Sequence, residues 1–220
     1  DALRFMLVTG NTPGHDLRFH FERLEGARNF ANKLWNAARF VLMNLEGYRP
    51  DGASSSRELA DRWILSRLSE TVARTTAGLE AYELGEAARA VYDFVWDEFC
   101  DWYIELAKPR LYGTDVERRA TAQHVLVTVL RTAVELLHPF MPHITEEIWQ
   151  QLPGRGETIM RASWPAARPE WRDLPAEERM ALVMDLTRAI RSLRAAMNVP
   201  RGARARAVVV VPRRELRAEL

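Results

Sequence analysis

Apolar residues recur at steps of three and four along most of the chain, and polar residues fill the positions between them. Within residues 28–44 the apolar positions form one stripe, made by Phe30, Leu34, Ala37, Ala38, Val41 and Leu42. This spacing is typical of an amphipathic helix, and no Gly or Pro interrupts it. We therefore predict a helix over about residues 18–45 that ends at Gly47.

The same periodicity predicts three further long helices, over residues 55–77, 81–107 and 114–138. A short fifth helix is expected over residues 144–151. Long helices with short connections and apolar stripes about one turn wide favour an antiparallel helical bundle, so the predicted fold class is all-α. The chain has 220 residues, enough for such a bundle and a smaller additional piece.

Local signals mark the ends of these helices. Ser55 with Glu58, and Thr114 with Glu117, match the S/T-x-x-E capping box that opens a helix. Pro109 lacks a backbone N–H and its ring clashes with the preceding turn, so we expect the third long helix to end before it.

The pattern changes after residue 152. Residues 153–173 are rich in Pro and show little periodicity, so we interpret them as a strap over the bundle, with a strand at 158–161. The rest predicts a helix, a strand and a second helix, over residues 175–197, 207–211 and 213–220. These elements are too few for a complete sheet, so we interpret residues 174–220 as a truncated small α/β subdomain.

Residues 1–17 predict a short apolar helix followed by a turn rich in Gly and Pro. The helix begins without a capping residue, which suggests a piece of a longer protein. We place a domain boundary after residue 17, so that the bundle covers residues 18–152.

Composition and charge limit the possible functions. The net charge is +1, yet 29 of the 31 basic residues are Arg, a bias that suits phosphate recognition but also a thermophilic source. Cys100 is the only cysteine, which excludes an internal disulfide and fits a reducing, cytoplasmic compartment. No run of about 18 apolar residues occurs, so we expect no membrane span.

No catalytic fingerprint is present, whether a phosphate loop, a dinucleotide motif or a nucleophile elbow. Glu135 and His138 match the Glu-x-x-His step of di-iron bundles, but the other ligands of such a site are missing. We expect His138 to be a capping or buried hydrogen-bonded residue and Cys100 to lie in the core. The chain is therefore predicted to hold no catalytic residue, metal or cofactor.

Beside the apolar stripe of residues 28–44 lies a polar band. It consists of Asn29, Asn32, Lys33, Asn36 and Arg39, with Phe40 next to it. Side-chain amides compete for backbone hydrogen bonds in a helix, so this concentration of Asn suggests a use beyond solvation. Amides, cations and a ring together suit unpaired nucleotides. An ordinary polar face with one core Phe is the alternative.

Four long motifs carry a family resemblance. They are N-F-A-N-K-L-W-N-A-A-R-F-V-L at 29–42, F-V-W-D-E-F-C-D-W-Y-I-E-L-A-K at 94–108, L-L-H-P-F-M-P-H-I-T-E-E-I-W at 136–149 and I-R-S-L-R-A-A-M-N-V-P at 190–200. They resemble the anticodon-binding domain of bacterial valyl-tRNA synthetases, a class I family, and together span nearly the whole chain. His143 departs from the family pattern, in which Phe or Tyr is commoner. An isoleucyl, leucyl, methionyl or cysteinyl synthetase bundle, and a helical interaction module without RNA, remain alternatives.

The resemblance implies a domain that recognises the stem and loop of tRNA(Val). The parent enzyme would activate valine with ATP and Mg and charge tRNA(Val), and its other domains would perform catalysis and editing. The catalytic motifs of the family are not found here, so the chain alone should be inactive. Its partners would be tRNA(Val) and the catalytic and editing domains of the same polypeptide, in a cytoplasmic monomer.

The resemblance also suggests roles for individual residues. The polar band would contact base edges and phosphates, and Phe40, which follows A-A-R, would stack on a base. Arg4 and Arg28 would meet the inner stem. A second basic surface would follow phosphates or simply be solvated, and its members are Arg191, Arg194, Arg201, Arg204 and Arg206.

Overall fold

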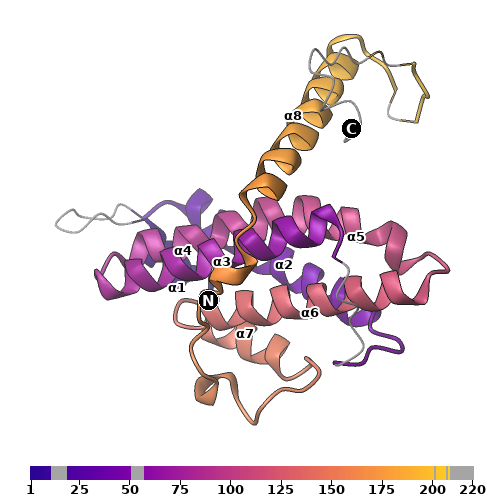
Figure 1. Cartoon of the computed structure of the whole chain (residues 1–220). Helices are drawn as coiled ribbons and strands as arrows, with labels where there is room; N and C mark the ends of the chain where they lie inside the picture. Colours follow the sequence, from indigo (N-terminus) through magenta and orange to yellow (C-terminus); the bar gives the residue numbers. More distant parts are fainter. Residues whose placement is uncertain (11–18, 51–56, 201, 207, 209–220) are drawn as a thin grey trace. The chain divides into compact units, whose positions relative to one another are not determined.

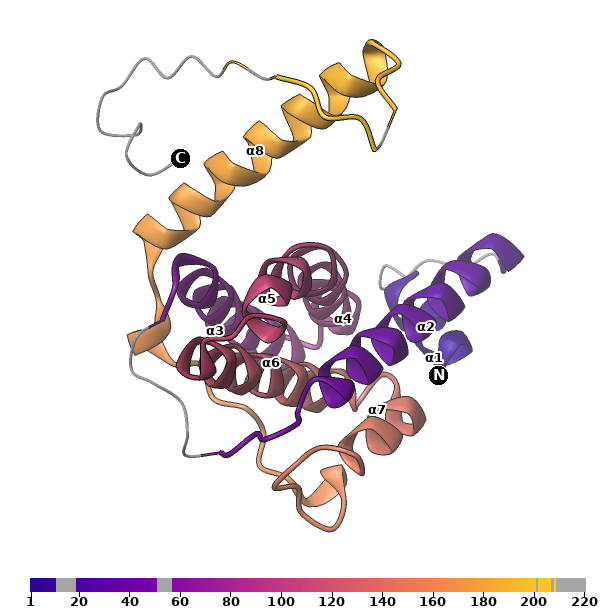
Figure 2. The same cartoon turned by 90° about the vertical axis from the view of Figure 1, so that its right-hand side faces the viewer.

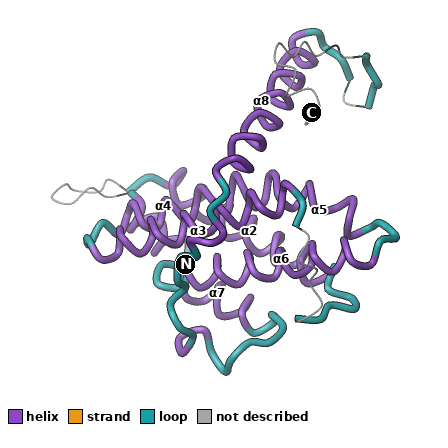
Figure 3. Tube along the Cα trace, in the orientation of Figure 1, coloured by secondary structure: helices purple, strands orange, loops and turns teal. Residues whose placement is uncertain are grey.

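The computed structural model of the chain describes residues 1–10, 19–50, 57–200, 202–206 and 208. The chain divides into two compact units, residues 1–172 and residues 173–220, which we describe separately. Figure 3 shows that the described part is made of helices and loops, with no strand. None of the described helices combines the length and the apolar composition that crossing a membrane requires.

The first unit is a helical bundle (Figure 1, Figure 2). Its helices are α1 (Ala2–Thr9), α2 (Phe21–Met43), α3 (Leu59–Glu80), α4 (Leu84–Asp93), α5 (Ile104–Leu111), α6 (Val116–Leu137) and α7 (Pro142–Trp149). A π-helical segment, η1 (Phe94–Tyr103), joins α4 to α5 without a break. The predicted all-α class and the long helices are confirmed.

The core lies where the predicted apolar stripes meet. In α2 the side chains of Phe30, Leu34 and Val41 are fully buried, as the three- and four-residue spacing predicted. Facing helices supply further fully buried side chains, among them Trp63 of α3 and Leu130 of α6. Because the stripe of α2 is buried, the polar band on its other side faces outward.

A buried ion pair crosses this core. The carboxylate of Asp61 on α3 accepts hydrogen bonds from the guanidinium of Arg110 on α5 at 2.6 and 2.8 Å, and from the hydroxyl of Tyr103 at 2.7 Å. Burial, reinforced by the charge of Asp61, raises the pKa of Tyr103 well above its usual value. Asp61 and Arg110 neutralise each other, Tyr103 adds a hydrogen bond, and together the three side chains tie α3, η1 and α5 together.

Pro109 does not end the third long helix, contrary to our prediction. Helix α5 continues through it to Leu111. Pro109 lies in the last turn, where the loss of one backbone hydrogen bond disturbs few residues, and the buried pair of Arg110 with Asp61 holds the following turn in place.

The predicted capping boxes are also corrected. The N-cap of α6 is Asp115, whose carboxylate accepts from the backbone N–H of Arg118 at 3.0 Å, so Thr114 is not the capping residue. At α3 the carboxylate of Asp61 accepts from the backbone N–H of Glu58 at 3.0 Å. Ser55 lies outside the described residues.

The predicted strand at 158–161 is wrong, because the segment forms a short 3₁₀ helix, η2 (Ile159–Arg161). The carboxylate of Glu146 on α7 accepts from the hydroxyl of Thr158 and from the backbone N–H of Ile159. The side chain of Glu146 thus satisfies the backbone N–H of Ile159, which in a strand would pair with a neighbouring strand. A second 3₁₀ turn, η3 (Pro169–Trp171), follows.

The described part of the second unit contains one helix, α8 (Leu174–Ala196), close to the predicted range of 175–197. The carboxylate of Asp173 caps it by accepting from the backbone N–H of Ala176 at 3.0 Å. Asn198, with a φ of +50°, follows its end. The predicted second helix and all of the predicted strand except Val208 lie outside the described residues, and Val208 is not in a strand.

Candidate nucleic-acid interface

The outward face of α2 carries most of the polar band. Asn29, Asn32, Asn36 and Arg39 are all exposed. None of these four side chains has a hydrogen-bond or ion-pair partner among the residues that the structure describes. Three amides and a guanidinium are therefore available to an external ligand along one face of a rigid helix.

Lys33 differs from the rest of the band. Its ammonium nitrogen lies 2.7 Å from the carboxylate of Asp101 and 3.9 Å from the centroid of the Trp96 ring. Only 23% of the Lys33 side chain is exposed. Lys33 thus joins α2 to η1, and its charge is already balanced by Asp101.

The π-helical geometry of η1 explains how two residues five apart reach the same lysine. The backbone N–H of Ile104 donates to the carbonyl of Phe99, five residues earlier, and such hydrogen bonds align residues i and i+5. In an α-helix, Trp96 and Asp101 would point about 140° apart. The wider helix therefore places the ring and the carboxylate on one side, toward Lys33.

Phe40 lies on the same edge of α2 as Lys33. It is half-buried, and the ammonium nitrogen of Lys108 on α5 lies 5.6 Å from the centroid of its ring. The only two lysines of the chain therefore both stand beside aromatic rings along this edge. One ring face next to a cation suits a stacked base with its phosphate.

The opposite edge of α2 borders an open groove against α7, with a volume of about 500 Å³. Trp35, 42% exposed, forms part of its wall, and Arg39 belongs both to this groove and to the polar band. Sequence reasoning missed Trp35. Its position outside the apolar stripe could have indicated it, because a tryptophan off the buried face of a helix needs another partner.

Arg4 on α1 and Arg28 on α2 each have a partner within the chain. The guanidinium of Arg4 donates to the carbonyl of Pro139 at 3.4 Å, and Arg28 forms an exposed ion pair with Glu25 at 2.9 Å. Exposed pairs of this kind are weak, so Arg28 can exchange its partner easily.

The predicted basic surface belongs to the second unit. Arg191 is exposed on α8, and Arg194 donates to the carbonyls of Pro200 and Ala203, which fastens the segment after the helix. Arg204 and Arg206 are exposed, while Arg201 lies outside the described residues.

His138 and Cys100, the residues with possible metal-binding or nucleophilic chemistry, lie in environments that suit a structural role. Nδ1 of His138 lies 2.7 Å from the hydroxyl of Thr145, which confirms the predicted hydrogen-bonded His, and burial lowers the pKa of His138. Burial raises the pKa of the Cys100 thiol to about 12, so the reactive thiolate is suppressed. Among the described residues, no group of three or more His, Cys, Asp or Glu could hold a metal ion.

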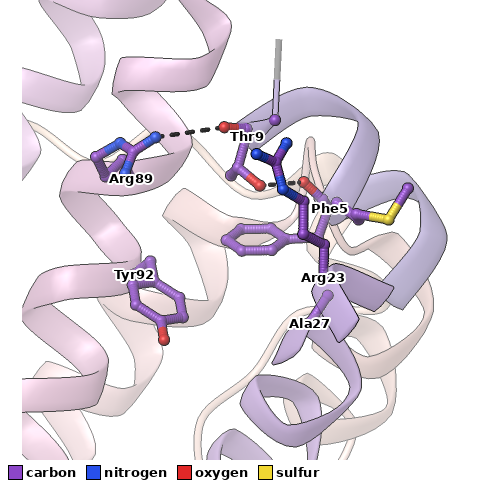
Figure 4. Close-up of a pocket in the computed structure, with 8 residues that line it drawn as sticks. Phe5, Thr9, Arg23, Ala27, Arg89 and Tyr92 are labelled. Atoms are coloured by element: carbon purple, nitrogen blue, oxygen red, sulfur yellow. Dashed lines mark hydrogen bonds between the residues drawn. The ribbon is translucent and has the colours of Figure 1, made fainter. Parts of the chain in front are cut away.

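A second cavity, of about 430 Å³, lies between α1, α2 and α4 (Figure 4). The rings of Phe5 and Tyr92 form part of its lining, and the guanidinium of Arg89 donates to the carbonyl of Thr9 at 3.4 Å. This contact satisfies a carbonyl in the last turn of α1, where a cation is favourable. Gly10, also in the lining, adjoins a segment outside the described residues.

Comparisons with known proteins identify the family of the chain. Residues 61–209 match the family described as the anticodon-binding domain of tRNA ligase. The chain therefore belongs to the anticodon-binding domain family of tRNA ligases. Within it, the chain corresponds to the anticodon-binding portion of valine–tRNA ligases, as the curated relatives indicate.

Those relatives cover nearly the whole chain, α2 included. This chain is 60% identical, over 98% of its length, to the valine–tRNA ligase of Carboxydothermus hydrogenoformans. It is 50% identical, over 96% of its length, to that of Symbiobacterium thermophilum. The chain spans 25% of the length of each. The predicted valyl family is confirmed.

Solved structures share the fold at low identity. The complex LeuRS–tRNA–LeuAMS of Agrobacterium radiobacter K84 matches 78% of this chain and 20% of that chain, with a TM-score of 0.59 and 20% identity. Free methionyl-tRNA synthetase of Mycobacterium tuberculosis matches 76% of this chain and 39% of that chain, with a TM-score of 0.58 and 21% identity. Both support the bundle architecture alone.

Proposed function

We propose that this chain recognises the anticodon stem and loop of tRNA(Val) as part of a valine–tRNA ligase. The observation that carries the proposal is the outward face of α2, where Asn29, Asn32, Asn36 and Arg39 are exposed without a described partner. The family to which the chain belongs and the relatives of the chain support the same function.

In this proposal the amides of α2 read the edges of unstacked loop bases. An Asn amide offers both donors and an acceptor, and each good base-edge contact contributes about 1–3 kcal/mol of discrimination. Arg39 would neutralise phosphates beside the bases, and Lys108 would join it by exchanging its ion pair with Glu105. Phe40 would stack on a base, and stacking contributes about 1–3 kcal/mol.

Lys33 has a different role in this proposal. Its ammonium already contacts Asp101 and Trp96, so it would hold η1 against α2 and keep Phe40 and its neighbours in position. A phosphate would have to displace Asp101 to reach it.

The remaining positively charged groups would contact the stem backbone. Arg4 and Arg28 would meet the inner stem. Arg191 and Arg194 of α8 would follow phosphates from the second unit, and residues 174–220 would be the first part of a small α/β subdomain.

The parent enzyme would be a cytoplasmic monomer that activates valine with ATP and Mg and charges tRNA(Val). Its catalytic and editing domains, on the same polypeptide, would be the further partners of this chain. Base recognition on α2 would then contribute to choosing the tRNA that these domains act on.

Binding of the 220-residue chain to tRNA(Val) transcripts tests the proposal. We expect tighter binding to the native anticodon than to a transcript with a changed middle base, at both low and moderate salt. Asn36→Ala and Arg39→Ala should reduce this preference. Arg74→Ala, an exposed arginine on α3, is the matched control and should keep it. Binding that ignores the anticodon would refute base reading.

A further inference from the structure

The groove between α2 and α7 has a composition unlike the rest of the outward face of α2. Its apolar lining comes from both helices, with Trp35, Ala38, Leu42 and Met43 on α2 and Ile148 on α7. The volume of about 500 Å³ falls within the usual range for small-molecule pockets. A flat apolar group the size of a nucleobase fits such a space.

Trp35 is the most unusual of these residues. Its side chain is 42% exposed, and its indole N–H has no hydrogen-bond partner among the described residues. Other rings of the bundle pack together, as Phe30, Tyr92 and Trp96 do, but Trp35 has no such described ring partner. The indole of Trp35 therefore has exposed surface and no described ring or hydrogen-bond partner beside the polar band.

The polar side chains around the groove divide by charge. Arg39 lies on α2, whereas Glu147 lies on α7 and Gln151 just beyond it. None of the three side chains forms a hydrogen bond with another described residue. A carboxylate and an amide accept from the amino groups of bases, and the carboxylate repels phosphate. A nucleotide would thus place its base in the groove and its phosphate near Arg39.

We propose that this groove holds one unpaired nucleobase of the bound RNA, stacked on the indole of Trp35. The inference rests on the proposed function, because the RNA must first lie on α2. Arg39 makes the groove continuous with the polar band, so a strand that crosses α2 passes from Phe40 over Asn36 and Arg39 to Trp35. Two rings on opposite edges of one helix then stack two different bases.

The test uses tRNA(Val) transcripts with the fluorescent base 2-aminopurine at one loop position at a time. The 220-residue chain should change the fluorescence at a position that Trp35 stacks. Trp35→Ala should abolish that change at this position alone and weaken binding about tenfold, while Trp35→Phe should keep the change and most of the affinity. Trp164→Ala is the matched control, since Trp164 on the strap is 40% exposed.

Other outcomes separate this inference from the proposed function. If Asn36→Ala and Arg39→Ala weaken binding while Trp35→Ala leaves both affinity and fluorescence unchanged, the groove does not hold a base and the inference is overturned. If none of the three variants affects binding, the proposed function itself fails. If Trp35→Ala instead dissociates a dimer in sedimentation and leaves RNA binding intact, the groove holds a second copy of the chain, which also overturns the inference.

Discussion

The ammonium nitrogen of Lys33 lies 2.7 Å from the carboxylate of Asp101, across 68 residues of sequence. The contact joins the candidate RNA-binding helix α2 to the π-helical segment η1. It also balances a positive charge that the sequence suggested for phosphate binding. The behaviour of this pair is therefore a direct test of how the α2 face works.

Asp101→Asn is expected to free Lys33 for a phosphate. Binding of tRNA(Val) should become tighter at low salt, and the slope of log affinity against log salt should steepen by about one unit. The free energy of unfolding should fall by less than about 1 kcal/mol, because the pair is partly exposed. Asp97→Asn, an exposed acid on the same segment, should leave the salt slope unchanged. An unchanged slope in Asp101→Asn would mean that Lys33 stays with η1 in the complex.

Phe40→Leu is expected to weaken tRNA binding about tenfold, because leucine keeps the apolar contacts but lacks the π face that stacks on a base. Phe40→Tyr should retain the affinity. Binding measured by titration, with the free energy of unfolding measured in urea for both variants, separates stacking from packing. A loss of stability in Phe40→Leu without a loss of binding would assign Phe40 to the core.

The buried pair of Asp61 and Arg110 should be critical for folding of the bundle. Asp61→Ala leaves the buried Arg110 with only the carboxylate of Glu58, 3.8 Å from its Nε, and should lower the free energy of unfolding by about 3–5 kcal/mol. Urea unfolding followed by tryptophan fluorescence measures this loss. Arg118→Ala removes an exposed ion pair with Glu58 and serves as the control, with a midpoint close to that of the parent chain. Equal midpoints for the two variants would contradict the assigned role of the buried pair.

Glu135 should make stability depend on pH. Burial raises its pKa in the folded state from 4.5 to about 7, with Arg131 opposing the shift. The folded state then binds more protons than the unfolded state, so stability is lost as pH rises from about 4.5 to 7. Water reaches part of the carboxyl, so we expect an effect on the order of 1 kcal/mol.

The Glu135 effect is measured by urea unfolding at pH 5 and pH 7.5. Glu135→Gln removes the ionisation and should reduce the loss of stability between the two pH values. An identical loss in the parent chain and the variant would show that another group titrates.

Much of the fold was predictable because it depends on local spacing. The apolar steps of three and four on α2 predicted which side chains would be buried. Phe30, Leu34 and Val41 are buried, as predicted. The two elements that were predicted wrongly depend on side-chain contacts with other helices, which local spacing does not show. The expected strand at 158–161 is a 3₁₀ turn that Glu146 binds, and α5 passes Pro109 beside the ion pair of Arg110.

For the candidate interface, the sequence identified the polar band and the ring at Phe40, whose RNA contacts remain predictions. It did not reveal that Lys33 is engaged by Asp101, or that Trp35 stands beside α7. Both depend on which helix packs against which edge of α2, and residue spacing within one helix contains no such information.

Helical period and ordered motifs are properties of neighbouring residues, so the bundle of amphipathic helices, its buried stripes and its family follow from the order of residues in the chain. Which polar groups are free depends instead on how the helices pack. Lys33 and Asn36 are equal members of one band in the sequence. In the fold, η1 brings a carboxylate and a ring to Lys33. The amide of Asn36 is exposed and forms no hydrogen bond with another described residue. The physical reason is that packing brings distant segments to one edge of a helix and leaves its outward face open to solvent.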